Sequence, residues 1–306
     1  MKIKAAARRL VSVIGNLPYL PGSVLPIDKQ APWSEFRKTN YESPYYFAKS
    51  VRAALFPIYA PFREVPHLPY EVPTNHPEQE DDEAWFFLNG ICTDRSVLRL
   101  NGKALADLFC RRIHLMHNPS DGIVLDLLEC AAGRTMQPVS TLDESVAHIL
   151  ADALSRHSKV VLIAHSQGGI IATGAVYKLI ERWSGRPELL GKLEIYTFAS
   201  AATEMNVPQI YCEHFYKTGD YVARIGVAAN PGGFSGRHFK ASGTGHLMNA
   251  HYLSDLAGGQ FRSQDDDPAS RLVSYFTPPR PAATARTAAR ARPASPRTRK
   301  TSATSD

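Results

Sequence analysis

Residues 160–169 read Val-Val-Leu-Ile-Ala-His-Ser-Gln-Gly-Gly, and this stretch decides the fold predicted for the chain. Its first four residues are apolar and mostly β-branched, which favours a strand buried on both faces of a parallel sheet. A tight turn at 164–168 follows, and from Gly169 onward small and apolar residues recur at helical spacing. The stretch therefore predicts a strand, a sharp turn that carries Ser166, and a helix.

A serine on such a turn is typical of a nucleophile elbow, in which the strained turn lifts the hydroxyl clear of the sheet. The positions two before and two after the serine must be small, because the strand and the helix pass close to each other there. Ala164 and Gly168 meet this condition, although the common form has glycine at both positions. The alternative is an ordinary strand–helix turn whose serine only caps the helix.

The composition is that of a globular chain with a basic tail. Of 306 residues, 44% are hydrophobic and 21% are charged, which suits one large α/β domain with tails or two small domains. The net charge of +6 equals that of residues 279–306, which hold seven Lys and Arg and one Asp. The rest of the chain is therefore close to neutral, which argues against a nucleic-acid groove in the folded domain.

The cysteines give no sign of a metal site. They are scattered, with no C-x-x-C pair and no histidine cluster at zinc spacing, so we expect reduced thiols and neither a metal nor an organic cofactor. The four are Cys92, Cys110, Cys130 and Cys212. No apolar run approaches the roughly 20 residues of a membrane span.

Three parts are predicted along the chain. Residues 1–84 form an N-terminal extension rich in proline and aromatic residues, in which 50–58 is either a short helix packed on the core or part of an element that covers the substrate. Residues 85–277 form the α/β domain. Residues 278–306, rich in Arg, Ala and Pro, have almost nothing to bury and are predicted to be disordered. We expect this tail to be a solvated linker, with at most weak contact to a polyanion or a membrane surface.

The first residues of the chain bear on its location. Four Lys and Arg residues in 2–9 precede a short apolar run that soon meets Gly15. A secretory signal would have a longer apolar core, so this pattern predicts a short basic amphipathic helix or a disordered start. We expect a cytoplasmic protein, with secretion and peripheral membrane association left open. No oligomeric state is predicted.

A second informative segment begins at Trp85. A buried strand that runs into Asn89-Gly90 is the arrangement in which the next loop gives a backbone N–H to an oxyanion hole. Asn-Gly is also a common tight turn. Asp94 then caps a helix predicted to run to about Arg112. The acidic run at 78–83 is predicted to be a surface linker, because contiguous like charges repel.

Strands and helices alternate along the rest of the chain, which predicts a mostly parallel sheet with helices on both faces. Further strands are expected within 113–118, at 193–198, from His214, and at 237–240, and helices at 140–156 and about 247–256. Residues 123–130 fit a strand or a helix, and the helix is preferred. Ser166, Asp220 and His246 each follow a predicted strand. Because the carboxyl ends of parallel strands share one edge, these three side chains should converge.

The order serine, aspartate, histidine along the chain is that of α/β-hydrolases. With the segments His-Ser-Gln-Gly, Thr-Gly-Asp-Tyr-Val and Gly-His-Leu-Met-Asn-Ala-His-Tyr-Leu, the region from Phe86 to about Leu256 resembles the α/β-hydrolase superfamily and, within it, lipases and esterases. The resemblance implies a serine hydrolase that cleaves a small-molecule or lipid carboxylic ester through an acyl-enzyme. It implies that Ser166 is the nucleophile, His246 the general base and Asp220 its partner, with backbone N–H groups of Gln167 and Ile91 as the oxyanion hole.

Alternatives remain at several of these positions. Asp220 could be a turn residue or a helix N-cap. His251, one turn into the following helix, is the alternative base, and His165 is expected to pack behind the site. A hydrolase fold without catalysis, used as a binding module, is one rival function. An acyltransferase or a thioesterase with the same triad is another.

Overall fold

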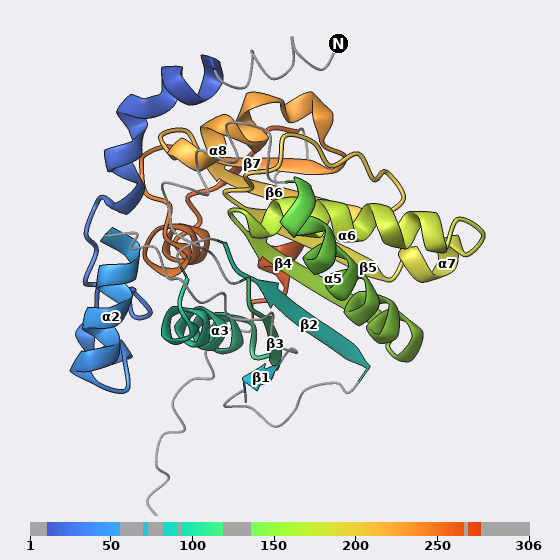
Figure 1. Ribbon diagram of the computed structural model, residues 1–306, viewed down its shortest axis with the longest axis horizontal. Coiled ribbons are helices and arrows are strands. Elements are labelled where there is room, and N and C mark those ends of the chain that lie inside the picture. The colour runs from blue at the N-terminus through green and yellow to red at the C-terminus, as the bar shows by residue number, and fades with distance from the viewer. Residues whose placement is uncertain are drawn as a thin grey trace, which may run out of the picture. The chain divides into compact units, whose positions relative to one another are not determined.

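The computed structural model describes residues 11–55, 70–72, 82–90, 93–118, 136–265 and 269–276. In these ranges the strands form one eight-stranded sheet in the order β1-β3-β2-β4-β5-β6-β7-β8 (Figure 1). The strands are β1 (Tyr70–Val72), β2 (Glu83–Leu88), β3 (Ile113–Met116), β4 (Lys159–His165), β5 (Leu193–Phe198), β6 (Tyr211–Lys217), β7 (Arg237–Ala241) and β8 (Arg262–Ser263). Only β1 and β8, at the two margins, pair antiparallel, so the sheet is mostly parallel as predicted.

Helices connect the strands and cover both faces of the sheet (Figure 1). The α-helices are α2 (Pro44–Leu55), α3 (Arg95–Phe109), α5 (Met136–Arg156), α6 (Gly168–Arg182), α7 (Pro187–Leu190), α8 (Tyr221–Ile225), α9 (Ser254–Ala257) and α10 (Arg271–Ser274). The 3-10 helices are η1 (Leu17–Val24), η2 (Lys38–Asn40), η3 (Val227–Ala229) and η4 (Pro231–Gly233), and η5 (Met248–Leu253) is a π-helix.

Strand β4 lies between the two cores, as its sequence predicts. Val160 and Leu162 point into a cluster with α5 and α6, whereas Val161 and Ile163 point into a second cluster with α3 and η5. Successive residues of a strand face opposite sides, so an apolar residue at every position is what a doubly covered central strand requires. The elbow that follows is thereby anchored on a central strand whose residues after Lys159 are all buried.

Several helices differ from the expectations in their limits. Asp94 caps α3 by accepting a hydrogen bond from Val97 N–H at 2.9 Å, but α3 ends three residues before Arg112, because Cys110 takes a left-handed conformation with φ 51°. The helix expected at about 247–256 begins as η5. The segment expected at 50–58 is the end of α2, as far as it is described. The helix expected at 123–130 and the tail at 278–306 lie outside the described residues.

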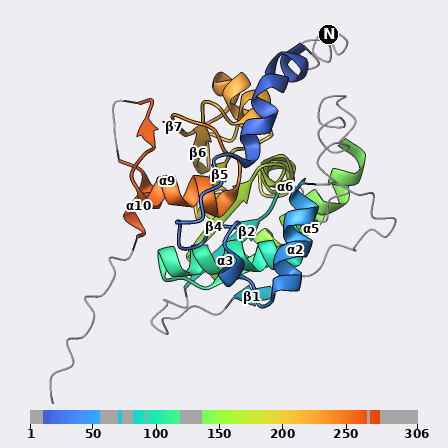
Figure 2. The ribbon, with the colours of Figure 1, turned by 90° about the vertical axis from the view of Figure 1, so that its left-hand side faces the viewer.

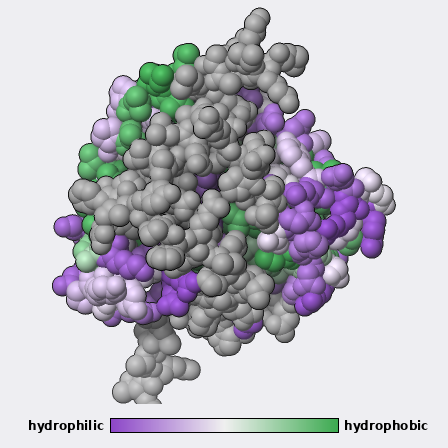
Figure 3. Space-filling model, in the orientation of Figure 1, coloured by the Kyte–Doolittle hydropathy of each residue, from purple (hydrophilic) through white to green (hydrophobic). Residues whose placement is uncertain are grey.

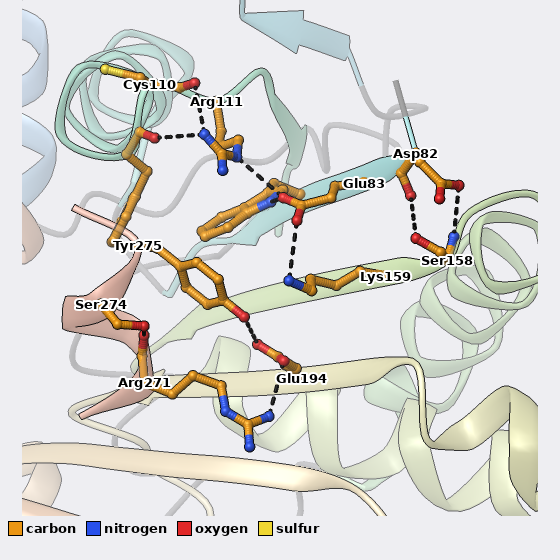
Figure 4. Close-up of polar contacts among 12 residues, drawn as sticks. Asp82, Glu83, Cys110, Arg111, Ser158, Lys159, Glu194, Arg271, Ser274 and Tyr275 are labelled. Atoms are coloured by element: carbon orange, nitrogen blue, oxygen red, sulfur yellow. Dashed lines mark hydrogen bonds and ion pairs between the residues drawn. The ribbon is translucent and has the colours of Figure 1, made fainter. Parts of the chain in front are cut away.

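One member of the acidic run is structural rather than part of a linker. Glu83 is the first residue of β2 and forms ion pairs of 3.1 Å with Arg111 and with Lys159, the first residue of β4 (Figure 4). The linker prediction was based on repulsion among the acidic side chains of 78–83. The cations Arg111 and Lys159 offset that repulsion at Glu83. Asp82 stays exposed and bonds Ser158.

The described N-terminal residues 11–41, which we call the strap, run along the domain beside η5 and α9 (Figure 2).

Among the described residues, no helix is both long and apolar enough to cross a membrane. The described cysteines, Cys110 and Cys212, are free thiols, and the described residues hold no cluster of three or more metal-binding side chains.

Candidate active site

Ser166 lies on the sharp turn between β4 and α6, with φ 59°. A left-handed conformation is unusual for a residue other than glycine and marks a strained turn. Close packing holds it there. A Cβ atom on Gly90 would come within 2.4 Å of Ser166 Cβ, and one on Gly168 would come within 2.6 Å of the Leu88 carbonyl oxygen. The small residues around the serine are therefore required by the approach of the loop after β2.

Three side chains from separate strand ends meet at this turn. Ser166 Oγ lies 2.9 Å from His246 Nε2, and His246 Nδ1 lies 2.8 Å from Asp220 Oδ2. His246 follows β7 and Asp220 follows β6. A carboxylate only accepts, so the Asp220 side requires the proton on Nδ1, which leaves the Nε2 lone pair for the serine hydroxyl. The arrangement can remove a proton from Ser166.

Asp220 is both the partner of His246 and a helix cap. Its Oδ1 accepts hydrogen bonds from Val222 and Ala223 N–H at the start of α8, while its Oδ2 accepts from His246 and, at 2.6 Å, from the Tyr252 hydroxyl. The side chain is fully buried. Burial alone would raise the pKa of Asp220, but the charge of His246 and the hydrogen bonds from His246 and Tyr252 hold the pKa below its ordinary value.

His251, the alternative base, has other partners. Its Nδ1 accepts from Leu247 N–H at 3.0 Å, and its Nε2 donates to the Pro26 carbonyl of the strap at 2.8 Å. Both ring nitrogens are thus occupied, and the side chain is 2% exposed. The structure brings His246, and not His251, to Ser166.

His165 packs against the back of the site, where it was expected. Its ring lies 4.8 Å from the His246 ring, centroid to centroid, and its Nε2 donates to the His246 carbonyl at 2.8 Å. Burial, with the neighbouring His246, lowers the pKa of His165 to about 3, so the imidazole is neutral at ordinary pH. It supports the backbone of His246 without adding charge.

A network of amides fixes the loops beside the serine. Asn89 Oδ1 accepts from Asn118 N–H at 2.7 Å, and Asn118 Nδ2 donates to Gln167 Oε1 at 2.7 Å. Gln167 is the N-cap of α6, so its N–H lies at the helix end, where backbone donors lack helical partners. Ile91, the other expected oxyanion donor, lies outside the described residues.

The strap holds the base loop, residues 242–247, through backbone contacts. The Gly22 carbonyl accepts from Gly245 N–H at 2.9 Å, and the Ser23 carbonyl accepts from His246 N–H at 2.7 Å. Thr244 Oγ1 donates to the Leu25 carbonyl at 3.0 Å. The residue expected to act as base is therefore fixed on its backbone by a segment more than two hundred residues earlier in the chain.

Glu35 caps η5, directly after the base loop. Its two carboxylate oxygens accept from Asn249 and Ala250 N–H, each at 2.8 Å, although Leu247, the N-cap, offers no side-chain acceptor. Glu35 is 6% exposed, and burial raises its pKa against the lowering effect of these hydrogen bonds. Sequence reasoning did not identify Glu35 or Asn118, because neither lies in a motif. It assigned no role to Tyr252, although Tyr252 lies in the segment that contains His246 and His251.

A family comparison agrees with this geometry. Residues 102–204 match the family model described as "Putative serine esterase (DUF676)", a stretch that includes β4, Ser166 and the whole of α6. The mostly parallel sheet with helices on both faces is the fold class that the sequence predicts. The match to a serine esterase family agrees with the resemblance inferred from the sequence and supports an ester hydrolase. No curated protein sequence matches the chain.

Solved structures of two esterases and a dienelactone hydrolase are similar to this chain at low identity. A "Structure of arylesterase" is 8% identical, with TM-score 0.42, and the match covers 71% of this chain and 88% of that one. An esterase from Pyrobaculum calidifontis is 9% identical, with TM-score 0.42 and coverage of 67% and 84%. A dienelactone hydrolase from Anabaena variabilis is 14% identical, with TM-score 0.39 and coverage of 64% and 97%.

Proposed function

We propose that this protein is a serine hydrolase that cleaves a carboxylic ester through an acyl-enzyme on Ser166. The observation that supports this most is the chain of two hydrogen bonds, 2.9 and 2.8 Å long, that joins Ser166 Oγ to His246 and His246 to Asp220. Such a pair of contacts activates a hydroxyl that is otherwise a weak nucleophile. The serine esterase family match points to the same chemistry.

The reaction would proceed in two halves. His246 Nε2 takes the hydroxyl proton as Ser166 Oγ attacks the ester carbonyl carbon, and the backbone N–H of Gln167 stabilises the resulting oxyanion. The tetrahedral intermediate collapses, and the alcohol leaves with the proton held by His246. Water then gives a proton to His246 and attacks the acyl-enzyme, which releases the carboxylic acid and restores the Ser166 hydroxyl.

Asp220 keeps His246 in the tautomer that this cycle needs. Its carboxylate holds the proton on Nδ1 and stabilises the imidazolium that forms in each half-reaction. The Tyr252 hydroxyl and the α8 amides hold the carboxylate in turn, so that it does not rotate away from the ring. Thioester cleavage and acyl transfer to another alcohol would use the same groups and differ in the acceptor.

Turnover of p-nitrophenyl esters of increasing chain length tests the proposal. We expect wild-type hydrolysis that Ser166→Ala abolishes, by a factor of about 10⁴ or more. A folded wild-type protein that cleaves none of the panel would favour the non-catalytic binding module instead. Transfer of the acyl group to an added alcohol in preference to water would indicate an acyltransferase.

A further inference from the structure

The outer face of the strap exposes a row of apolar side chains. Of the large hydrophobic residues that are exposed in the described part of the chain, six lie within residues 11–27, and the space-filling view shows a hydrophobic band there (Figure 3). They are Val11 (70% exposed), Ile14 (57%), Leu17 (46%), Tyr19 (36%), Leu25 (47%) and Ile27 (55%). Single exposed apolar residues are ordinary, but a continuous row marks an interaction surface.

The charges in this part of the sequence indicate what the row contacts. Residues 11–27 contain no charged side chain, and the first 27 residues hold four cations and no anion. Arg224 adds a cation from α8, with its guanidinium 3.9 Å from the Tyr19 ring centroid. Apolar side chains combined with cations and an absence of anions fit an anionic lipid surface, where the former enter the acyl boundary and the latter face the headgroups.

The inner face of the strap is already used by the domain. Val13, between Val11 and Ile14, is buried, and Arg224 Nε donates to Asn16 Oδ1 at 2.6 Å. The carbonyls of 22–26 accept from the base loop and from His251, as described above. The apolar row is therefore presented outward by a segment that is fixed from behind, and whatever it contacts comes to lie beside the candidate active site.

We propose that the strap is a docking surface for anionic lipid bilayers. The apolar row inserts at the headgroup boundary, the cations of residues 2–9 attract the anionic surface, and the base loop behind the strap is held next to the lipid. Docking stands independently of catalysis. The substrate class, in contrast, rests on the proposed ester hydrolysis: docking and hydrolysis together make membrane-embedded acyl esters the substrate.

Vesicle co-sedimentation of the full-length protein tests the docking. The probes are phosphatidylcholine vesicles with and without phosphatidylglycerol, and the variants are Ile14→Ser and Ile27→Ser, alone and combined. We expect wild type to prefer the anionic vesicles and each substitution to weaken binding about tenfold, since each removes a side chain that would bury its apolar area in lipid. Val273→Ser, an exposed apolar residue on α10, is the matched control and should bind as wild type does.

The basic C-terminal tail is present in every variant, so its attraction to anionic vesicles cancels in these comparisons. At about 1 M salt, where the Debye length falls to about 3 Å, the difference between wild type and Ile14→Ser should persist, because insertion of an apolar side chain is not screened. All measurements are repeated on Ser166→Ala, so a failure of the proposed catalysis leaves the docking result unaffected.

Three results would overturn the docking proposal. They are no binding of wild type to anionic vesicles, equal binding by wild type and the Ile14→Ser, Ile27→Ser double variant, and a dimer in solution that the double variant abolishes while no vesicles are bound. The last would assign the apolar row to a second copy of this chain.

Discussion

The two edges of the parallel sheet both bury carboxylates, but they use them differently. At the amino edge Glu83 and Glu194 lie at the beginnings of β2 and β5 (Figure 4), and Glu213 lies near the beginning of β6. Glu194 accepts from the hydroxyls of Tyr196 and Tyr275 and pairs with Arg271 at 3.0 Å. At the carboxyl edge Asp220 instead meets an imidazole whose other nitrogen reaches a serine. The carboxylates at the amino edge hold secondary-structure elements together. The carboxylate at the carboxyl edge can orient a histidine that transfers protons.

The partner decides which of these roles a buried carboxylate has. Arginine stays protonated at any ordinary pH, and a tyrosine hydroxyl donates without changing charge, so the amino edge is a fixed structure. Histidine gains and loses a proton near neutral pH, so the pair at the carboxyl edge can act in a reaction.

Glu35 is an intermediate case. It caps a helix, as Glu213 does for α10 by accepting from Arg271 and Leu272 N–H, but the helix that it caps follows the base loop.

The largest expected effect on activity distinguishes His246 from His251, the two histidines compared as candidate bases. His246→Ala should lower kcat/KM for a soluble ester by about 10⁴- to 10⁶-fold, because Ser166 loses its base. His251→Ala removes a tether between the strap and η5 and should cost about tenfold, together with thermal stability. Steady-state kinetics on both purified variants, with circular dichroism to verify folding, measures this. An equal loss in the two variants would mean that the base has been misidentified.

Next in size is the replacement of the carboxylate on which the comparison depends. Asp220→Asn should lower kcat by about 10³- to 10⁴-fold, since an amide can hold the imidazole in the wrong tautomer. The matched substitution at the amino edge, Glu194→Gln, should leave kcat within a factor of two or so and lower the free energy of unfolding by about 1–3 kcal/mol. Kinetics and urea unfolding of both variants test this. A Glu194→Gln enzyme as impaired as Asp220→Asn would remove the distinction between the edges.

A smaller effect is expected from the two glutamates that cap helices. Glu35→Gln and Glu213→Gln each place an amide donor where a carboxylate oxygen accepted from backbone N–H, so both should destabilise the fold by a similar amount. Only Glu35→Gln should also reduce kcat, by about 10- to 100-fold, because a shift of η5 moves the base loop away from Ser166. The rate of labelling by a fluorophosphonate reports on this geometry without a substrate-binding step. If both variants label as fast as wild type, Glu35 has only a structural role.

The smallest effect concerns a buried carboxylate at neither edge. Asp143, on α5, faces α6, and within the described residues its Oδ1 has no hydrogen-bond partner. Burial raises the pKa of Asp143 to about 7 from its ordinary 3.8. The folded protein thus binds this proton more tightly than the unfolded chain does, so stability should fall as pH rises from about 4 to 7.

Asp143→Asn should remove that dependence. We expect the variant to gain on the order of 1–3 kcal/mol over wild type at a pH above this window and little below it. Urea unfolding at several pH values measures the difference, and esterase activity should not change. A gain that is the same at every pH would show that Asp143 does not titrate in this range.

The parts of the fold that local patterns encode could be predicted from the sequence. The apolar run before Ser166 and the small residues around it give the strand, the elbow and the helix, since period and residue size are local properties. Parallel topology then brings the ends of β4, β6 and β7 together, which is why Ser166, Asp220 and His246 could be named as a group. Asp220 proved to be an N-cap as well as the partner of His246, so two alternatives hold at once.

What the sequence could not give depends on contacts between distant segments. His246 and His251 lie five residues apart in one segment. They differ in their hydrogen-bond partners, because the Pro26 carbonyl of the strap accepts from His251 Nε2. Glu35 and Asn249 are separated by 214 residues, and no pattern links them. Glu83 appeared to belong to a solvated acidic run because its two cations come from β4 and from the connection between α3 and β3. The domain limits and the oxyanion role of Ile91 stay predictions.

The central claim is that Ser166 is the nucleophile and that His246 activates it. Tandem mass spectrometry of the protein after reaction with a fluorophosphonate tests it most directly, because the reagent forms a stable covalent bond only with an activated serine. We predict one adduct, located on Ser166, that forms in wild type and in His251→Ala but not in His246→Ala. An unlabelled wild-type protein, or an adduct on any other serine, would contradict the account.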